Sequence, residues 1–267
     1  MWAGECHIDD ICQAIGMEPM EFRRKNLMPV GYTDGFSRNE LYADTFNQCM
    51  DKGMAMLDYQ RKYREYKNQT GPVRRGVGLA VFWYNTAVWP ISLESSSCRM
   101  VLNQDGSLQF QTGETEIGQG CDTAYSQMVA DAVGIPVEDV HVVSTQDTDV
   151  TPFDTGAYAS RQTYVSGMAC KKCGEEFRHK ILEYAAYMLN HDVTDLSRTV
   201  YAEEVKAAGM RIREALGLHE GEEITEDMLD IADSKVIVSG GAPELFDVSV
   251  VADTAFYSLD RSVHITA

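Results

Sequence analysis

Two glycine-rich polar segments carry the side chains that are best suited to bind a ligand. They read TGETEIGQG at residues 112–120 and TPFDTGAYASRQ at residues 151–162. Glycine lets the backbone approach a ligand closely, and the polar side chains between the glycines can donate or accept hydrogen bonds. Each segment directly precedes a predicted helix, whose first N–H groups favour an anion. Together the segments predict a large, polar, phosphorylated ligand that is held from two sides.

The composition of the chain limits its partners and its location. Its 267 residues are 44% hydrophobic and 24% charged, as in an ordinary globular protein, and the formal net charge is −18. This charge argues against nucleic acid or an anionic membrane as the main partner. No apolar run approaches the ~20 residues that cross a bilayer, and the N-terminus does not resemble a signal peptide. The seven cysteines predict reduced thiols, so we expect a cytoplasmic protein.

The hydrophobic periodicity predicts two regions of different character. Residues 1–71 form a helical segment, with short helices expected within 7–27, a single helix expected at 44–67 and a break at 68–72. Residues 72–267 form an α+β region in which mixed sheets are flanked by helices. The expected strands are 76–84, 92–102, 108–112, 137–144, 235–238 and 263–267, and the expected helices are 122–133, 164–189 and 245–258.

Residues 191–233 differ from the rest of the second region. They hold two Glu-rich helical patterns with little apolar content, so we expect a charged surface insertion at about 191–233. The strand expected at 263–267 has no predicted partner. Because an unpaired strand and exposed apolar edges favour association between chains, we also expect self-association.

Three stretches of the chain resemble a known enzyme family. They are IDDICQAIGMEPMEFRRKNL at 8–27, DGSLQFQTGETEIGQG at 105–120 and PVEDVHVVSTQDTDVTPFDTGAYASRQTYVSGMA at 136–169. They resemble the molybdenum-binding large subunit of the xanthine dehydrogenase family, and the resemblance covers most of the chain outside 191–233. It implies a partial molybdopterin-binding domain, with the cofactor in its cytosine dinucleotide form. It also implies oxidative hydroxylation of a purine or other N-heterocycle, with iron–sulfur and FAD subunits and the remainder of the molybdenum subunit as partners.

The resemblance also assigns site residues position by position. Gln119 matches the glutamine beside the apical oxo ligand of molybdenum, and a neutral amide suits such a buried site. Arg161 matches a donor to the cofactor phosphates, a role that suits a guanidinium. The alternative interpretations are a tight strand-to-helix turn for Gln119 and a salt bridge at a helix start for Arg161. The full set of cofactor-binding positions is Gly118, Gln119, Gly120, Ser160, Arg161 and Gln162.

Substrate and metal ligands are less clearly marked in the sequence. Xanthine-oxidising relatives commonly place a glutamate just before the TPFDTG loop, where this chain has Gln146 and Asp147. Either residue could contact a substrate, or the substrate is not a purine. Cys170 and Cys173 form a CxxC pair, but one pair without further ligands leaves a zinc site incomplete. We therefore expect no metal site formed by protein ligands.

The resemblance implies that catalysis needs a residue outside this sequence. The family's catalytic base is a glutamate in a Gly-x-Gly-Glu motif near the C-terminus of the subunit, and this sequence lacks that motif. We therefore expect no catalytic residue in this chain, and a fragment that is inactive and free of cofactor when alone. The alternative is a non-catalytic assembly or binding module, either a piece of a split subunit or a degenerate paralogue. Downstream codons for Gly-x-Gly-Glu would favour the enzyme, and their absence would favour the module.

Overall fold

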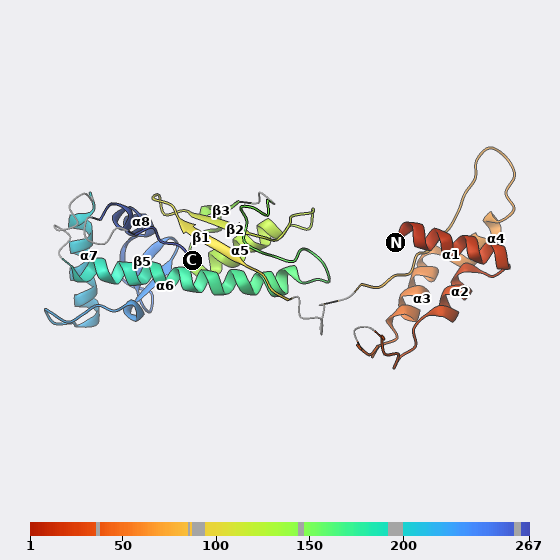
Figure 1. Cartoon of the computed structure of the whole chain (residues 1–267), viewed down its shortest axis with the longest axis horizontal. Coiled ribbons are helices and arrows are strands. Elements are labelled where there is room, and N and C mark those ends of the chain that lie inside the picture. Colours follow the sequence, from red (N-terminus) through yellow and green to blue (C-terminus); the bar gives the residue numbers. More distant parts are fainter. Residues whose placement is uncertain (36–37, 85, 87–93, 144–146, 192–199, 259–262) are drawn as a thin grey trace. The chain divides into compact units, whose positions relative to one another are not determined.

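The computed structural model describes residues 1–35, 38–84, 86, 94–143, 147–191, 200–258 and 263–267. The chain divides into two compact units, Met1–Ser92 and Leu93–Ala267. The first is coloured red to orange in Figure 1 and the second yellow to blue. The region boundary expected after residue 71 falls inside the first unit.

The first unit is helical, and particular residues end its helices. The helices are α1 (Trp2–Ile15), α2 (Pro19–Asn26), α3 (Thr45–Leu57) and α4 (Tyr59–Tyr66). Gly16 ends α1 because it adopts the left-handed conformation, at φ 71. The single helix expected at 44–67 is wrong, because Asp58 is also left-handed, at φ 51, and separates α3 from α4. Met20, Met50 and Tyr59 form the small core of this unit.

The strand expected at 76–84 is not present, although the hydrophobic alternation of the segment corresponds to a buried side and an exposed side. Val77, Leu79 and Val81 are partly buried and pack against the small core of the first unit, while the positions between them are exposed. Helices cover this apolar side, and the backbone N–H of Val81 donates to the Glu5 carboxylate at 3.0 Å. An alternating pattern shows that one side of a segment is buried, but it does not show that a neighbouring strand exists.

A mixed three-stranded sheet organises one half of the second unit. It consists of β1 (Cys98–Leu102), β2 (Leu108–Thr112) and β3 (Val140–Val143), in that order. β1 and β2 form the expected antiparallel hairpin, and β2 and β3 are parallel and are joined through α5 (Cys121–Val133). The inward side chains of β2 are fully buried, and Phe110 packs edge-on against Tyr125 of α5. The strand expected at 137–144 begins at Val140, because Val137–Asp139 forms a 3-10 turn.

The last residues of the chain pair with β1, so the expectation that the strand at 263–267 has no partner is wrong. The N–H groups of Met100 and Leu102 donate to the carbonyls of Ala267 at 2.8 Å and Ile265 at 3.1 Å. Ala267 donates back to Met100 at 3.1 Å. The partner strand is distant in sequence, so the local pattern could not indicate it. Self-association of the chain stays a prediction.

Removing residues 265–267 should expose this edge of the sheet. We expect amide hydrogen exchange at Met100 and Leu102 to become faster by at least about tenfold, because both N–H groups lose their acceptors. Exchange at Phe110 on the central strand is the control and should change much less. Unchanged protection of Met100 and Leu102 would contradict this pairing.

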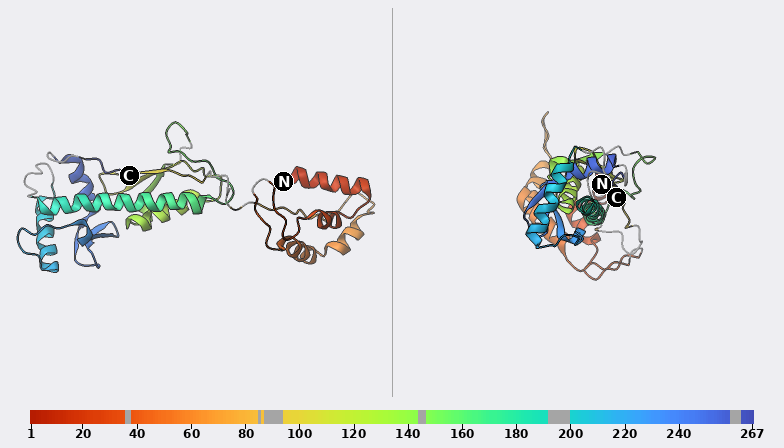
Figure 2. Two further views of the ribbon diagram at one scale, coloured as in Figure 1. Left: turned by 60° about the horizontal axis from the view of Figure 1, so that its bottom comes forward. Right: turned by 90° about the vertical axis from the view of Figure 1, so that its left-hand side faces the viewer.

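The long helix α6 (Gly167–Asn190) joins the two halves of the second unit. It packs on α5 and β1 near its start and on β4, α7 and α8 further along, as Figures 1 and 2 show. Phe177, Ile181 and Met188 are among its most buried positions. A π-helical turn, η2 (Gln162–Ser166), leads into it, so the helix expected at 164–189 is confirmed.

A second antiparallel sheet and two helices complete the second unit. They are β4 (Leu229–Ala232), β5 (Lys235–Val238), β6 (Glu244–Asp247), α7 (Ala202–Leu216) and α8 (Val248–Tyr257). The helix expected at 245–258 therefore begins three residues later, after a strand. The predicted α+β class is confirmed. Within the described parts of the chain, no helix combines the length and the hydrophobicity that crossing a membrane requires.

The expectation of a charged surface insertion at 191–233 does not describe the observed segment. Val205, Ala208 and Ile212 on α7 are each at most 1% exposed and belong to the main core. The second Glu-rich pattern forms only a short 3-10 helix, Glu226–Met228, before β4, in which Leu229 and Ile231 are buried. A few apolar residues at helical and strand spacing are enough to bury one face, and the abundant glutamates lie on the other.

Candidate functional site

The topology brings the two glycine-rich segments to the same edge of the sheet. Segment 113–120 follows the end of β2, and the stretch that leads to Gln162 follows the end of β3. Because β2 and β3 are parallel neighbours, their carboxyl ends lie side by side, where ligands of α/β sheets commonly bind. Helix α5 and the π-helical turn η2 both begin at this edge. We call segments 113–120 and 151–162 the site loops.

Gln119 and Gln162 join the two site loops directly. The Gln119 side-chain nitrogen donates to the Gln162 side-chain oxygen at 2.7 Å and to the carbonyl of Thr115 at 2.9 Å. The oxygen of Gln119 accepts the N–H of Ile117 at 2.7 Å. Gln119 is solvent-exposed, and these bonds within the site loops fix the orientation of its amide.

The backbone of the first site loop binds a carboxylate of its own. The N–H groups of Gly118 and Gly120 donate to one oxygen of Glu116 at 2.6 and 3.1 Å, and Asp122 donates to the other at 3.3 Å. Both glycines have positive φ, 99 and 84, which lets successive N–H groups point inward. The Gly120 N–H and its neighbours lower the pKa of Glu116 to about 2. The loop is therefore an anion-binding backbone, with the Glu116 carboxylate in the place of an external anion.

The lowered pKa of Glu116 predicts a specific pH dependence. Its folded pKa of about 2 lies below the ordinary value of 4.5, so ionised Glu116 stabilises the fold above pH about 4.5. This contribution is lost as the pH falls through about 2. An NMR titration of the Glu116 carboxyl carbon should give a midpoint near 2 in the folded chain, with the urea-unfolded chain as the control. A folded midpoint near 4.5 would contradict the binding of this carboxylate by the loop.

Arg161, near the end of the second site loop, is buried, and its side chain points inward. Its guanidinium donates to Glu114 at 2.5 Å, to Asp154 at 2.6 Å and to the carbonyl of Gly156 at 3.0 Å. It also donates to the carbonyl of Ser95 at 2.5 Å and to Glu94 at 3.4 Å. The side chains of Arg161, Glu114 and Asp154 are each 0% exposed. This arrangement is the salt bridge at a helix start that the sequence left open as an alternative.

Glu114 connects the buried charges to the second site loop. Its carboxylate accepts from Ser166 at 2.8 Å and from Gln162 at 3.0 Å, in addition to Arg161. Burial raises the pKa of Glu114, because removal from water disfavours its charge. Sequence reasoning assigned no role to Glu114 or Glu116. The signal that could have found them is the presence of two glutamates inside a glycine-rich loop.

Ser160 lies next to these charges in an unusual backbone conformation. Ala159 and Ser160 both have positive φ, at 50 and 57, a conformation that costs a non-glycine residue of order 1 kcal/mol. Ala159 is buried, whereas Ser160 is exposed at the loop surface. Such strain is often found at functional sites. Here it turns the chain so that Arg161 points inward while the hydroxyl of Ser160 stays in reach of solvent.

Of the two residues expected to contact substrate, Asp147 contacts the start of the second site loop, because its carbonyl accepts from the N–H and the hydroxyl of Thr151 at 2.8 and 2.9 Å. Asp147 accepts the N–H of Asp149 at 2.9 Å and thereby shapes its own turn. Gln146 lies outside the described residues. The substrate role of either residue stays a prediction.

One group of potential metal ligands is present among the described residues. The side-chain ligand atoms of Glu116, Cys121 and Asp122 lie within 4.8 Å of one another. The backbone N–H groups already hold Glu116, and burial raises the pKa of Cys121 to about 12. A protonated thiol is a poor metal ligand, so this group adds no support for a metal site.

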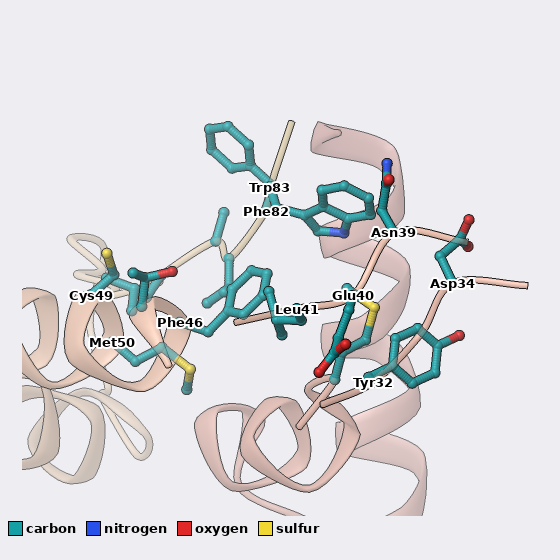
Figure 3. A pocket seen from close by; sticks show the side chains of 15 residues that line it. Tyr32, Asp34, Asn39, Glu40, Leu41, Phe46, Cys49, Met50, Phe82 and Trp83 are labelled. Atoms are coloured by element: carbon teal, nitrogen blue, oxygen red, sulfur yellow. The ribbon is translucent and has the colours of Figure 1, made fainter. Parts of the chain in front are cut away.

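A pocket in the first unit does not involve the site loops. It has a volume of about 470 Å³ and is lined by residues of that unit, among them Tyr32, Leu41, Phe46 and Trp83. Figure 3 shows the aromatic rings of Phe46 and Trp83 at its border. None of the predicted site residues lines it.

Comparison with known proteins places these features in a family. Residues 52–255 match the molybdopterin cofactor-binding domain family. The xanthine dehydrogenase molybdenum-binding subunit of Escherichia coli O157:H7 is 43% identical over 197 residues, which cover 74% of this chain and 26% of that protein. The carbon monoxide dehydrogenase large chain of Hydrogenophaga pseudoflava is 28% identical over 213 residues, again 74% of this chain and 26% of the relative.

This chain also matches a part of a longer chain in a solved structure. CO dehydrogenase from Oligotropha carboxidovorans has a TM-score of 0.48 and 18% identity, covering 98% of this chain and 31% of that one. The chain thus spans about a quarter of the length of the two curated relatives. The family match includes both site loops, α5 and α6. The chain therefore belongs to the molybdopterin cofactor-binding domain family, within the xanthine dehydrogenase group of molybdenum-binding subunits.

Proposed function

We propose that this chain is the part of a molybdenum hydroxylase subunit that holds the molybdopterin cofactor with its two site loops. The observation that carries the proposal is the contact between Gln119 and Gln162 at 2.7 Å, which joins two segments 43 positions apart at the carboxyl edge of β2 and β3. The proposed reaction of the whole enzyme is oxidative hydroxylation of a purine or another N-heterocycle. Iron–sulfur and FAD subunits and the rest of the molybdenum subunit are the proposed partners.

The donor set at this edge fits such a cofactor. A dinucleotide form of molybdopterin is large, polar and anionic, and backbone N–H groups are suitable donors to its phosphates. Gly118 and Gly120 present N–H groups that already hold a carboxylate. Gln119 and Ser160 are exposed on the two site loops. When bound, the cofactor supplies the redox chemistry, and the chain supplies binding and orientation.

Glu116 must give up its place for an anionic ligand to use the same N–H groups. Its carboxylate accepts from the backbone N–H groups of Gly118, Gly120 and Asp122, so an anionic ligand has to replace these hydrogen bonds. We therefore propose Gly118 and Gly120 as direct cofactor contacts through their backbone.

We propose a positioning role for Arg161 within this site. Glu114, Asp154 and backbone carbonyls already use its hydrogen-bond donors, so contact with a phosphate would require the loss of buried ion pairs. Arg161 instead fixes Glu114, which in turn accepts from Gln162. The guanidinium thereby holds the side chain that meets Gln119.

Cofactor retention by the native polypeptide tests this function. We expect the wild-type polypeptide that carries this sequence to keep molybdenum through gel filtration. The Gln119→Ala variant should retain at least about tenfold less, since it loses the amide and the link to Gln162. Metal content is measured by mass spectrometry of the ashed protein, and cytidine monophosphate release by acid hydrolysis reports the dinucleotide form.

Gln127→Ala is the matched control for this experiment. Gln127 is an exposed glutamine on α5, in the same unit but outside the site loops, so its loss should leave molybdenum retention unchanged. A wild-type polypeptide without molybdenum would refute the proposed function. Equal retention by the two variants would refute the role of Gln119.

A further inference from the structure

Three cysteines from distant parts of the second unit meet where β1 packs on α6. Cys98 begins β1, while Cys170 and Cys173 lie on the same side of α6, one turn apart. The Cys98 sulfur is 3.4 Å from the carbonyl oxygen of Ala169, and the Cys173 sulfur is 3.9 Å from that of Cys98. The CxxC pair that looked isolated in the sequence therefore has a third thiol beside it.

The neighbouring thiols also affect one another's pKa. The interaction with Cys170 is the largest cause that raises the pKa of Cys98 to about 12, whereas the interaction with Cys173 lowers it. The interaction with Cys98 is the largest cause that raises the pKa of Cys173.

The three cysteines differ in solvent exposure: two are partly exposed and the third is buried. Cys98 and Cys173 are half-buried, so a small reagent can reach them. Cys170 is 1% exposed, and the packing of α6 on α5 and β1 covers it. Proximity and access together therefore favour reaction between Cys98 and Cys173.

We propose that Cys98 and Cys173 form a thiol-modification site at which a small disulfide, of the glutathione disulfide class, produces an intramolecular disulfide. One cysteine sulfur attacks the reagent, forms a mixed disulfide and expels one glutathione thiolate. The other cysteine sulfur then attacks the mixed disulfide and expels the second. The two cysteines lose two electrons and two protons, and glutathione disulfide is reduced to two molecules of glutathione.

The product would connect the start of β1 to α6. The bonded residues are 75 positions apart, so the crosslink restricts the unfolded chain strongly and should make the second unit more resistant to denaturant. The same helix continues from the turn that carries Gln162. The modification site does not depend on the proposed function, because its thiols make no contact with the site loops in the interactions described above.

Peptide mapping of the oxidised full chain tests the proposal. Trypsin cleaves after Lys171 and Lys172, so Cys98, Cys170 and Cys173 fall in separate peptides, 76–99, 162–171 and 173–178. After treatment with glutathione disulfide and digestion without reductant, we expect a linked peptide that joins 76–99 to 173–178. The exposed Cys49 of the first unit should form a mixed disulfide with glutathione, which shows that the reagent was active.

Cysteine variants separate this bond from other products. Cys98→Ser should abolish the linked peptide and leave Cys173 as a mixed disulfide, whereas Cys170→Ser should keep the link. The urea midpoint should rise on oxidation in the wild type and in Cys170→Ser, and not in Cys98→Ser. A link from 76–99 to 162–171 alone would overturn the proposal. So would the absence of any link while Cys49 is modified.

Discussion

Replacing Arg161 with methionine should lower the free energy of unfolding of the second unit by about 3–5 kcal/mol. The guanidinium is 0% exposed and lies between the carboxylates of Glu114 and Asp154, which are equally buried. Methionine fills a similar volume but leaves both carboxylates without their counter-charge. The penalty for two unpaired buried acids is much larger than the loss of one hydrogen bond.

Urea denaturation, followed by the fluorescence and circular dichroism of the chain, measures this effect. Arg99→Met on β1 is the matched control, because Arg99 is exposed and its loss should change stability by no more than about 0.5 kcal/mol. Arg161→Lys should be intermediate, since lysine keeps the charge but not the planar set of donors. A cost for Arg161→Met below about 1 kcal/mol would contradict the buried ion network.

Replacing Gly113 with alanine should be nearly as damaging, for a steric reason. A β-carbon at position 113 would lie 2.1 Å from the carbonyl oxygen of Pro152 and 2.8 Å from the backbone nitrogen of Asp154. The second site loop must therefore move away from the first. We expect a loss of about 3 kcal/mol of stability, together with a shift of Asp154 away from Arg161.

Gly209→Ala is the control for the steric argument. Gly209 lies inside α7, and the nearest atom to a β-carbon there is the carbonyl oxygen of Leu189 at 3.7 Å, an ordinary contact. Alanine should stabilise the chain there by about 0.5–1 kcal/mol. The two glycine variants should therefore shift the urea midpoint in opposite directions. A neutral Gly113→Ala variant would show that the loops are not packed as closely as described.

The sequence predicted those parts of the fold that depend on local pattern. The hairpin of β1 and β2, helix α5 and helix α6 all have strong apolar periodicity with clear turns between them. Prediction from the sequence failed where the packing partner of a segment is distant in the chain. The segment at 76–84 alternates like a strand but is covered by helices. Residues 265–267 pair with β1, although most of the sequence of the second unit separates the two segments.

The charged segment shows how composition can mislead. The glutamates of α7 dominate its appearance, but Val205, Ala208 and Ile212 are buried in the main core. A helix needs only one narrow apolar stripe to be buried on one side. Counting charges over 191–233 therefore indicated a surface insertion, whereas the spacing of the few apolar residues indicates a packed helix.

The candidate site was predictable in its position more than in its internal chemistry. The glycine-rich loops marked the edge of the sheet, and the structure brings Gln119 to Gln162 there. The partners of Arg161 could not be inferred, because Glu114 is 47 positions away and Glu94 is 67 positions away. Whether a guanidinium faces a ligand or a buried carboxylate depends on packing that no local pattern contains.

The position of molybdenum in crystals of the native polypeptide tests the central claim most directly. Diffraction data collected above the molybdenum absorption edge locate the metal without any assumption about the cofactor. The account predicts one anomalous peak at the carboxyl edge of β2 and β3, next to the Gln119 amide and bordered by both site loops. A molybdenum peak bordered by neither site loop would contradict it.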